Sequence, residues 1–390
     1  MPGFDMAKFA FGHPEKLVDF SSRSEHEMTV KAKALARAFY GRDAAHSYWI
    51  GCSTGGKQGL TEAQRFPDDY EGILAGAPAN NWTRLMVGDF DAVLAAAKDS
   101  ANVLGAPELE LLNRSVLAAC DKLDGVTDGV LEDPRRCAFD VATLKCGGNA
   151  VPGSCLTGAQ LELARRVYRG AVDPKNGTSL YPGLAFGSEP LWRAMLTPAN
   201  PFPIPISFYR WLVFADSQWN WKTFDLSHPS DYQAFQKGET TLAPVLSAVD
   251  PDLRKFRDRG GKLVQYHGWI DQLISPSNSI NYYESVLAFF GRGKGERTET
   301  LRDVQGFYRL YMVPGVAHCG GGTGPNSFDL QTSLERWVEQ RAAPEAVIAT
   351  HSANGVVDRT RPLCPYPKTA VYKGSGDAND ASNFVCSDAK

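Results

Sequence analysis

The fold is decided by residues 46–66, HSYWIGCSTGGKQGLTEAQRF. The first five residues are aromatic and β-branched, which predicts a short β-strand. Residues 54–66 predict a helix that Pro67 ends. Residues 24–40 place apolar side chains at helical spacing, and residues 72–79 are typical of a buried strand with a small-residue end. Helices that alternate with apolar strands predict a parallel α/β sheet.

The turn between this strand and helix carries Gly51-Cys52-Ser53-Thr54-Gly55, which fits the G-x-S-x-G pattern of a nucleophile elbow. Glycines are expected because the turn is too tight for Cβ atoms, and the serine hydroxyl is then exposed above the sheet. The following helix aims its N–H groups at the site, so the Thr54 N–H is the expected oxyanion donor. Cys52 is not the expected nucleophile, because the second position of the elbow points away from the site.

A serine nucleophile needs a general base, and the later part of the chain offers two histidines after predicted strands. His318 lies in a glycine-rich loop after the last good strand, and Asp271 follows the preceding strand. The order Ser53, Asp271, His318 is that of an α/β-hydrolase triad. Taken singly, His318 fits a loop histidine without a role equally well, and Asp271 fits a helix cap equally well. His267, the rival base, suits a supporting role better.

The cysteines strengthen this interpretation. Cys52 precedes Ser53 and Cys319 follows His318, so contact between the two catalytic side chains brings the cysteines within the roughly 4.4–6.8 Å Cα separation of a disulfide. An even number of paired cysteines predicts four disulfides and an oxidising compartment, with eight reduced thiols in a cytosolic enzyme as the alternative. The other six cysteines form the close sequence pairs Cys120/Cys137, Cys146/Cys155 and Cys364/Cys386.

Length and composition limit the class of protein. With 390 residues, the chain is longer than one compact core usually holds, and its 43% hydrophobic and 22% charged residues are those of a globular protein. The formal net charge is −3 and no basic patch stands out in the sequence, which argues against a nucleic-acid partner. No apolar run predicts a membrane span. Residues 1–6 do not resemble a signal peptide, so we expect a longer precursor whose mature form is secreted or periplasmic.

The chain divides into three segments. Residues 1–79 form the first, N-terminally short part of the predicted core, and residues 246–390 form the second part. Between them, residues 80–245 lose the alternation of strands and helices, which predicts an inserted lid domain. The alternation returns with predicted strands at residues 262–266 and 307–313.

An acidic loop lies within the predicted lid at residues 121–133, DKLDGVTDGVLED. It packs five carboxylates into thirteen residues, and two glycines let it curl. Hard oxygen ligands of this kind suit Ca²⁺, although the spacing is not that of an EF-hand. A solvated acidic turn is the alternative. Cys120 and Cys137 bracket the loop, and an ion there would be structural.

Three motifs together resemble the tannase and feruloyl esterase family, which also includes the hydrolase of mono(2-hydroxyethyl) terephthalate. They are residues 51–56 (GCSTGG), 267–271 (HGWID) and 318–321 (HCGG). The joined Cys-Ser and His-Cys pairs make the resemblance specific. It implies an α/β-hydrolase core with a lid, a triad formed by the residues proposed above, and a Cys52–Cys319 bridge.

The resemblance also implies a structural calcium ion in the lid. Family members carry a longer N-terminal region with early strands and a second oxyanion donor, and a missing strand leaves a sheet edge exposed. The calcium ligands that the resemblance implies are the carboxylates of Asp121, Asp124 and Asp128 and the carbonyls of Val126 and Val130.

The expected activity is hydrolysis of small aromatic acid esters, such as galloyl or feruloyl esters. Amide hydrolysis and a catalytically silent binding protein of the same fold are the alternatives. No pattern indicates an oligomeric state. The predicted lid contains aromatic side chains that either stack on a substrate ring or form the lid's own core: Phe208, Tyr209, Trp211, Phe214, Trp219 and Trp221.

Overall fold

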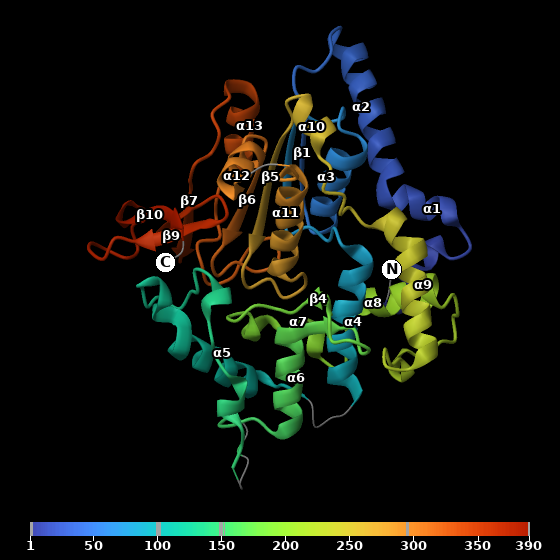
Figure 1. Cartoon of the computed structure of the whole chain (residues 1–390), viewed down its shortest axis with the longest axis vertical. Coiled ribbons are helices and arrows are strands. Elements are labelled where there is room, and N and C mark those ends of the chain that lie inside the picture. Colours follow the sequence, from blue (N-terminus) through green and yellow to red (C-terminus); the bar gives the residue numbers. More distant parts are fainter. Residues whose placement is uncertain (1–2, 99–102, 148–150, 152, 294–295, 389–390) are drawn as a thin grey trace.

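The core is a four-stranded parallel sheet with the strand order β1-β2-β5-β6 (Figure 1). The strands are β1 (Tyr48–Cys52), β2 (Gly72–Gly76), β5 (Lys262–Gly268) and β6 (Tyr308–Val313). The computed structural model describes residues 3–98, 103–147, 151, 153–293 and 296–388. This is the core of an α/β-hydrolase, the predicted fold class.

Helices cover both faces of the sheet. On one face, Ile73 and Leu263 pack with side chains of α3 (Thr54–Arg65), α10 (Arg254–Asp258), α11 (Pro276–Phe290) and α12 (Arg297–Gln305). On the other face, the neighbouring Leu74 and Val264 pack against α13 (Leu330–Gln340). Successive strand residues are therefore buried on opposite faces, which explains why the strands are continuously apolar.

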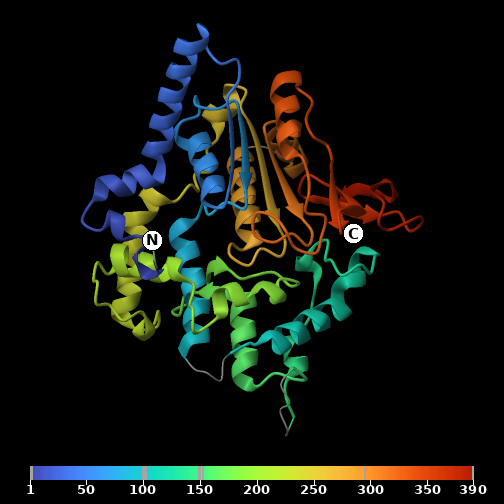
Figure 2. The same ribbon diagram turned by 180° about the vertical axis from the view of Figure 1, so that it is seen from behind.

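The inserted segment leaves and rejoins the core at adjacent points. The Ala248 N–H donates to the Asn80 carbonyl (2.8 Å), and the Asn80 amide donates back to the Ala248 carbonyl (3.2 Å). Figures 1 and 2 both show the segment packed beneath the sheet. Its elements are α4 (Trp82–Lys98), α5 (Ala106–Cys120), α6 (Gly158–Arg169), β3 (Gly170–Val172), β4 (Ser179–Pro182), α7 (Arg193–Leu196), α8 (Pro203–Phe208) and α9 (Pro229–Leu246).

The first described residues pack against this inserted segment and not against the sheet. Ala10 and Leu17, the latter in α1 (Pro14–Val18), share an apolar cluster with Phe90 of α4. The Trp211 indole N–H donates to the carbonyl of Phe4 (2.9 Å). The start of the chain, which the sequence analysis assigned to the core, therefore contacts the inserted segment.

Helix α2 (Ser24–Tyr40) has the predicted bounds, but its apolar side chains are largely uncovered. Leu35 is 71% exposed and Phe39 is 82% exposed. Strand β1 is the outermost strand of the sheet, and its Ile50 is 49% exposed. In the strand order, β1 and β6 are the two edge strands.

The C-terminal tail forms two antiparallel hairpins, which the sequence analysis did not anticipate. One pairs β7 (Val347–Ala353) with β8 (Val356–Leu363), and the other pairs β9 (Lys368–Tyr372) with β10 (Phe384–Asp388). A disulfide joins Cys364 to Cys386 of β10. Within the described ranges, no helix combines the length and hydropathy that a bilayer crossing requires.

The predicted pair of Cys146 and Cys155 is a disulfide of the inserted segment, with Cα atoms 4.9 Å apart. It closes a short loop just before α6. The Cys146 N–H donates to the Leu156 carbonyl (2.9 Å), and the Leu156 N–H donates to the Leu144 carbonyl (2.8 Å). Cys155 is therefore confirmed as a disulfide cysteine, but it belongs to the scaffold of the inserted segment and does not adjoin Ser53, Asp271 or His318 in the sequence.

Candidate active site

Ser53 occupies the turn between β1 and α3 in a strained backbone conformation. Its φ of 63° and ψ of −118° are unusual for a residue other than glycine and are characteristic of functional turns. The Ser53 N–H donates to the Gly76 carbonyl (2.9 Å), and the Ser53 carbonyl accepts from Ala79 (3.1 Å). These bonds fix the backbone of the turn against the end of β2.

Two glycines make this turn possible. A Cβ at Gly51 would lie 2.6 Å from the Gly55 carbonyl carbon, and a Cβ at Gly56 would lie 2.2 Å from the Gly76 carbonyl oxygen. At Gly55 itself, a Cβ would meet nothing closer than 3.9 Å. The expectation that the turn has no space for a Cβ atom is therefore correct at Gly51 but not at Gly55. The second position where a Cβ atom would clash is Gly56.

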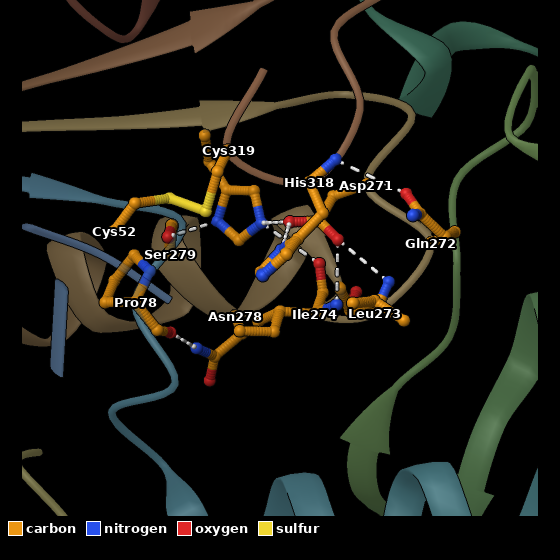
Figure 3. Close-up of polar contacts among 12 residues, drawn as sticks. Cys52, Pro78, Asp271, Gln272, Leu273, Ile274, Asn278, Ser279, His318 and Cys319 are labelled. Carbon is orange, nitrogen blue, oxygen red and sulfur yellow. Dashed lines mark hydrogen bonds and ion pairs between the residues drawn. A yellow bond between two sulfur atoms is a disulfide. The ribbon is translucent and has the colours of Figure 1, made fainter. Parts of the chain in front are cut away.

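A disulfide ties the Ser53 turn to the loop that follows β6. Cys52 and Cys319 are bonded, with Cα atoms 5.8 Å apart, although 267 residues separate them in the sequence. Figure 3 shows this bridge beside His318. The bonded cysteines are the direct neighbours of Ser53 and His318, so the two candidate residues lie on adjacent segments of backbone.

Asp271 and His318 form a buried hydrogen-bonded pair. Asp271 lies in the turn after β5 and has no exposed surface. Its Oδ2 is 2.8 Å from Nδ1 of His318 (Figure 3). Its Oδ1 accepts the backbone N–H groups of Leu273 (2.8 Å) and Ile274 (2.9 Å). The turn therefore orients the carboxylate, which in turn orients the imidazole.

His267, the rival base in the sequence, supports this carboxylate. Its Nε2 lies 3.1 Å from Asp271 Oδ2 and 3.0 Å from the Ile274 carbonyl, both of which are acceptors. Nε2 must therefore carry a proton, and Nδ1 lies 2.6 Å from the Ser279 hydroxyl. His267 is fully buried, in the supporting position that the sequence analysis favoured.

The electrostatics of the pair favour an ionised Asp271. Burial alone would raise the pKa of this carboxyl, but the hydrogen bonds from His267 and His318 outweigh burial and lower the pKa to about 2. An ionised Asp271 holds the proton of His318 on Nδ1. Nε2 of His318 is then free to accept a proton from a nucleophile.

The remaining contact of a triad is not formed in this arrangement. Within the described residues, the Ser53 hydroxyl makes no hydrogen bond to His318 or to any other side chain. The structure therefore joins His318 to Asp271 directly and holds Ser53 near them through the disulfide.

An apolar cavity of about 170 Å³ opens beside the elbow. Thr54, the first residue of α3, lines it, and its N–H has no partner within the helix. The walls come from the N-terminal segment and the inserted segment, namely Met6, Ala7, Phe9, Leu17, Phe20, Trp82, Ile204, Ser207, Phe208, Leu212 and Leu246. A cavity of this size and polarity accommodates a single aromatic ring.

Most of the aromatic residues singled out in the lid belong to its own core. Tyr209, Trp211 and Trp221 are each less than 10% exposed, and Phe90 packs against Tyr209 with ring centroids 5.0 Å apart. Phe208 is the exception, because it lines the cavity beside Thr54. The interpretation as lid core therefore holds for most of this set.

The sequence analysis missed Asp89, a fully buried carboxyl on α4 of the inserted segment. Burial raises its pKa well above the usual range, and the charge of Asp271 raises it further. Burial and the charge of Asp271 thus both act against ionisation of Asp89. An acid within a helical stretch, with Asp91 two residues later, carries no sequence signal that would have revealed this position.

The acidic loop curls as expected, between cysteines that form a disulfide, Cys120–Cys137. Its carboxylates accept local N–H groups: Asp121 binds those of Asp128 and Gly129, and Asp124 binds that of Val126. No group of three or more His, Cys, Asp or Glu side chains in the described part of the chain is arranged to hold a metal ion.

Part of the loop's charge is neutralised within the protein, because Asp128 Oδ2 forms ion pairs with Arg361 and Arg359, whereas the other carboxylates remain crowded. Burial raises the pKa of Asp124 to about 6, and the charges of Asp128 and Asp121 add to this against a backbone hydrogen bond. Burial likewise raises the pKa of Glu132 to about 8. The oxygens of these crowded carboxylates are ligands of the kind that Ca²⁺ prefers, and a bound Ca²⁺ would reduce the repulsion between them.

Known proteins resemble this chain along nearly its whole length. A family model described as tannase and feruloyl esterase matches residues 2–387. An uncharacterised esterase of Xanthomonas campestris is 35% identical over 98% of this chain and 72% of its own length. Feruloyl esterase B of Aspergillus niger is 33% identical over 98% of this chain and 74% of its own. The crystal structure of feruloyl esterase B from Aspergillus oryzae matches with a TM-score of 0.87 and 29% identity, covering 97% of this chain and 76% of that one.

Proposed function

This chain belongs to the tannase and feruloyl esterase family and is a carboxylic ester hydrolase, and from that premise we propose that it cleaves aromatic acid esters with a triad of Ser53, His318 and Asp271. The observation that carries the proposal is the disulfide between Cys52 and Cys319. It places the strained serine turn against the loop that presents His318.

In the proposed reaction, His318 Nε2 takes the proton of the Ser53 hydroxyl as its oxygen attacks the ester carbonyl. Asp271, held ionised by its hydrogen bonds, keeps the other imidazole proton on Nδ1 and stabilises the imidazolium that forms. The Thr54 N–H donates to the developing oxyanion. The alcohol leaves with the proton from His318, and water then releases the acid from the acyl-enzyme by the same steps.

The apolar cavity beside Thr54 supports an aromatic acyl group. It is sized for one ring, and Phe20, Trp82 and Phe208 contribute aromatic walls. An aliphatic acyl group of similar length would leave the cavity partly empty and lose contact with those walls. The names of the related feruloyl esterases point to the same class of substrate.

Two further parts of the proposal concern the protein's environment. Asp121, Asp124 and Asp128, with the carbonyls of Val126 and Val130, would hold a structural Ca²⁺ that stabilises the acidic loop. The four disulfides favour a protein that folds in an oxidising compartment, so we place it outside the cell or in a periplasm. The comparisons do not favour the alternative of a catalytically silent binding protein with the same fold.

Hydrolysis of methyl ferulate, methyl gallate and p-nitrophenyl acetate tests the proposal. We expect Ser53→Ala to lose at least 10³-fold in kcat on all three esters while keeping its melting temperature. Ser217→Ala, which removes an exposed lid hydroxyl, serves as the matched control. Full activity of Ser53→Ala, or no hydrolysis of any ester by the folded wild type, would contradict the proposal. Faster hydrolysis of the matching anilides than of the esters would favour an amidase.

A further inference from the structure

A second depression, which we name the basic groove, lies at the end of the sheet remote from Ser53. It has a volume of about 990 Å³ and lies between α12, α13 and the first residues of β5 and β6. Lys262 begins β5, whereas the loops with Asp271 and His318 follow the other ends of these parallel strands. Figure 1 shows α12 and α13 beside the sheet, with the inserted segment beyond its opposite end. The basic groove is therefore separate from the candidate active site.

The charge of the basic groove opposes that of the chain. The whole protein has a formal net charge of −3. The groove walls nevertheless carry six cationic side chains against two carboxylates, those of Glu345 and Asp388. A concave surface with an excess of one sign focuses its field and concentrates counter-ions. The six cations are Lys262, Arg297, Arg302, Arg309, Arg341 and Lys368.

Three exposed cations of the groove have no acidic partner. In the ranges that the structure describes, Arg302, Arg341 and Lys368 form no ion pair. The burial of Lys262 lowers the pKa of its amine, and the charge of Arg341 lowers it further. The groove thus holds like charges that repel one another, and an anion placed between them would relieve this repulsion.

The floor of the groove is rigid. Arg309 is buried, and its guanidinium donates to the carbonyls of Pro344 (2.6 Å) and Gln305 (3.2 Å). The Lys262 amine and the Arg309 guanidinium each lie 5.4 Å from the centroid of the Trp337 ring. Packing and hydrogen bonds fix these floor groups, so an anion binding here has to order only the exposed side chains at the rim.

The shape and chemistry of the groove favour a chain of carboxylates. The volume exceeds that of a single inorganic anion and suits several linked anionic units. The exposed Glu345 carboxylate already forms an ion pair with Arg309 at 3.0 Å, so a cation of the groove can bind a carboxylate. The one aromatic ring in the lining, Trp337, is 3% exposed and offers no face on which a nucleobase could stack.

We infer that the basic groove binds a linear polycarboxylate, such as an oligomer of a uronic acid, at a site distinct from the catalytic centre. Arg302, Arg341 and Lys368 contact its carboxylates at the rim, while Arg309 and Lys262 form the floor. The inference does not depend on the reaction at Ser53.

Calorimetric titration with oligogalacturonate in low-salt buffer tests this inference. The variant Arg302→Glu/Arg341→Glu removes two rim cations. Arg37→Glu/Arg42→Glu makes the same change in net charge on the exposed, remote α2 region and serves as the matched control. We expect binding to be at least tenfold weaker for the groove variant and unchanged for the control, since hydrogen bonds to charged groups are lost only in the first. Affinity should fall as salt is added.

Hydrolysis of p-nitrophenyl acetate by both variants at the wild-type rate would show that they are folded and that the groove is separate from catalysis. No heat of binding by the wild type, or equal weakening in both variants, would overturn the inference. Tighter binding of polyphosphate or of single-stranded oligothymidylate than of oligogalacturonate would overturn the assignment to carboxylates.

Discussion

Removal of the Cys52–Cys319 disulfide is expected to damage both stability and catalysis. The bond closes a loop of 267 residues. By the chain-entropy relation, constraining a loop of that length stabilises the fold by up to about 5–6 kcal/mol. The same bond holds the Ser53 turn against the His318 loop. A displacement of about 1 Å between two reacting groups lowers a rate by roughly 10²-fold. We therefore expect Cys52→Ala/Cys319→Ala to unfold more easily and to lose about 10²-fold in kcat.

The matched control is Cys364→Ala/Cys386→Ala, which opens a loop of 22 residues in the C-terminal hairpins. The same relation assigns that bond about 3 kcal/mol, and no catalytic residue lies beside it. Urea unfolding and the steady-state kinetics of methyl ferulate hydrolysis should be measured for both variants. Loss of stability in both, with loss of kcat only in the first, is the expected result. An unchanged kcat in Cys52→Ala/Cys319→Ala would refute the reasoning that the bridge aligns the site.

Three other outcomes follow from the structure. Asp271→Asn should lower kcat by about 10⁴-fold, because an amide cannot hold the Nδ1 proton of His318 as the carboxylate does. The pKa of Asp271 is lowered from 3.8 to about 2, so its ionised form contributes about 2 kcal/mol to the free energy of unfolding above pH 4. This contribution is lost as the pH falls through 2. Acid unfolding curves should show the loss for the wild type but not for Asp271→Asn. Burial raises the pKa of Glu62 from 4.5 to about 8, so stability should fall as the pH rises from 4.5 through 8, and Glu62→Gln should flatten this decline in melting temperature. EGTA should lower the melting temperature of the wild type. The decrease corresponds to about 3 kcal/mol if calcium had been present at a hundred times its Kd. EGTA should leave the melting temperature of Asp124→Ala unchanged.

The central part of the fold was predictable because its signals are local. The strand, glycine turn and helix around Ser53 follow from a short aromatic run, a tight turn and a proline stop. The structure gives β1 (Tyr48–Cys52) and α3 (Thr54–Arg65), within two residues of the predicted bounds. The order of the strands in the sheet could not be obtained in this way, because it depends on pairing between segments distant in sequence.

Where tertiary contacts decide, the sequence was less informative. Helix α2 was correctly located by its periodic apolar residues, yet Leu35 and Phe39 are exposed, because periodicity does not reveal what covers a helix. The C-terminal hairpins were not anticipated, because each of their strands is stabilised mainly by its partner strand.

The sequence analysis paired Asp271 with His318 and gave His267 a supporting place, and the structure joins all three by hydrogen bonds. The sequence analysis linked Ser53 to His318 through a disulfide expected between their neighbouring cysteines, and Cys52 and Cys319 form that disulfide in the structure. The backbone donors to Asp271 and the burial of Asp89 could not be found from sequence, because they depend on how the turn after β5 and the inserted helix α4 meet in space.

Covalent trapping of the nucleophile tests the account most directly. An aryl fluorophosphonate phosphonylates an activated serine, and peptide mapping by mass spectrometry then locates the modified residue. We predict one label per protein molecule, on Ser53, and no label when His318 is replaced by alanine. A label on another residue, or an undiminished label on Ser53 in His318→Ala, would contradict the claim that these side chains act together.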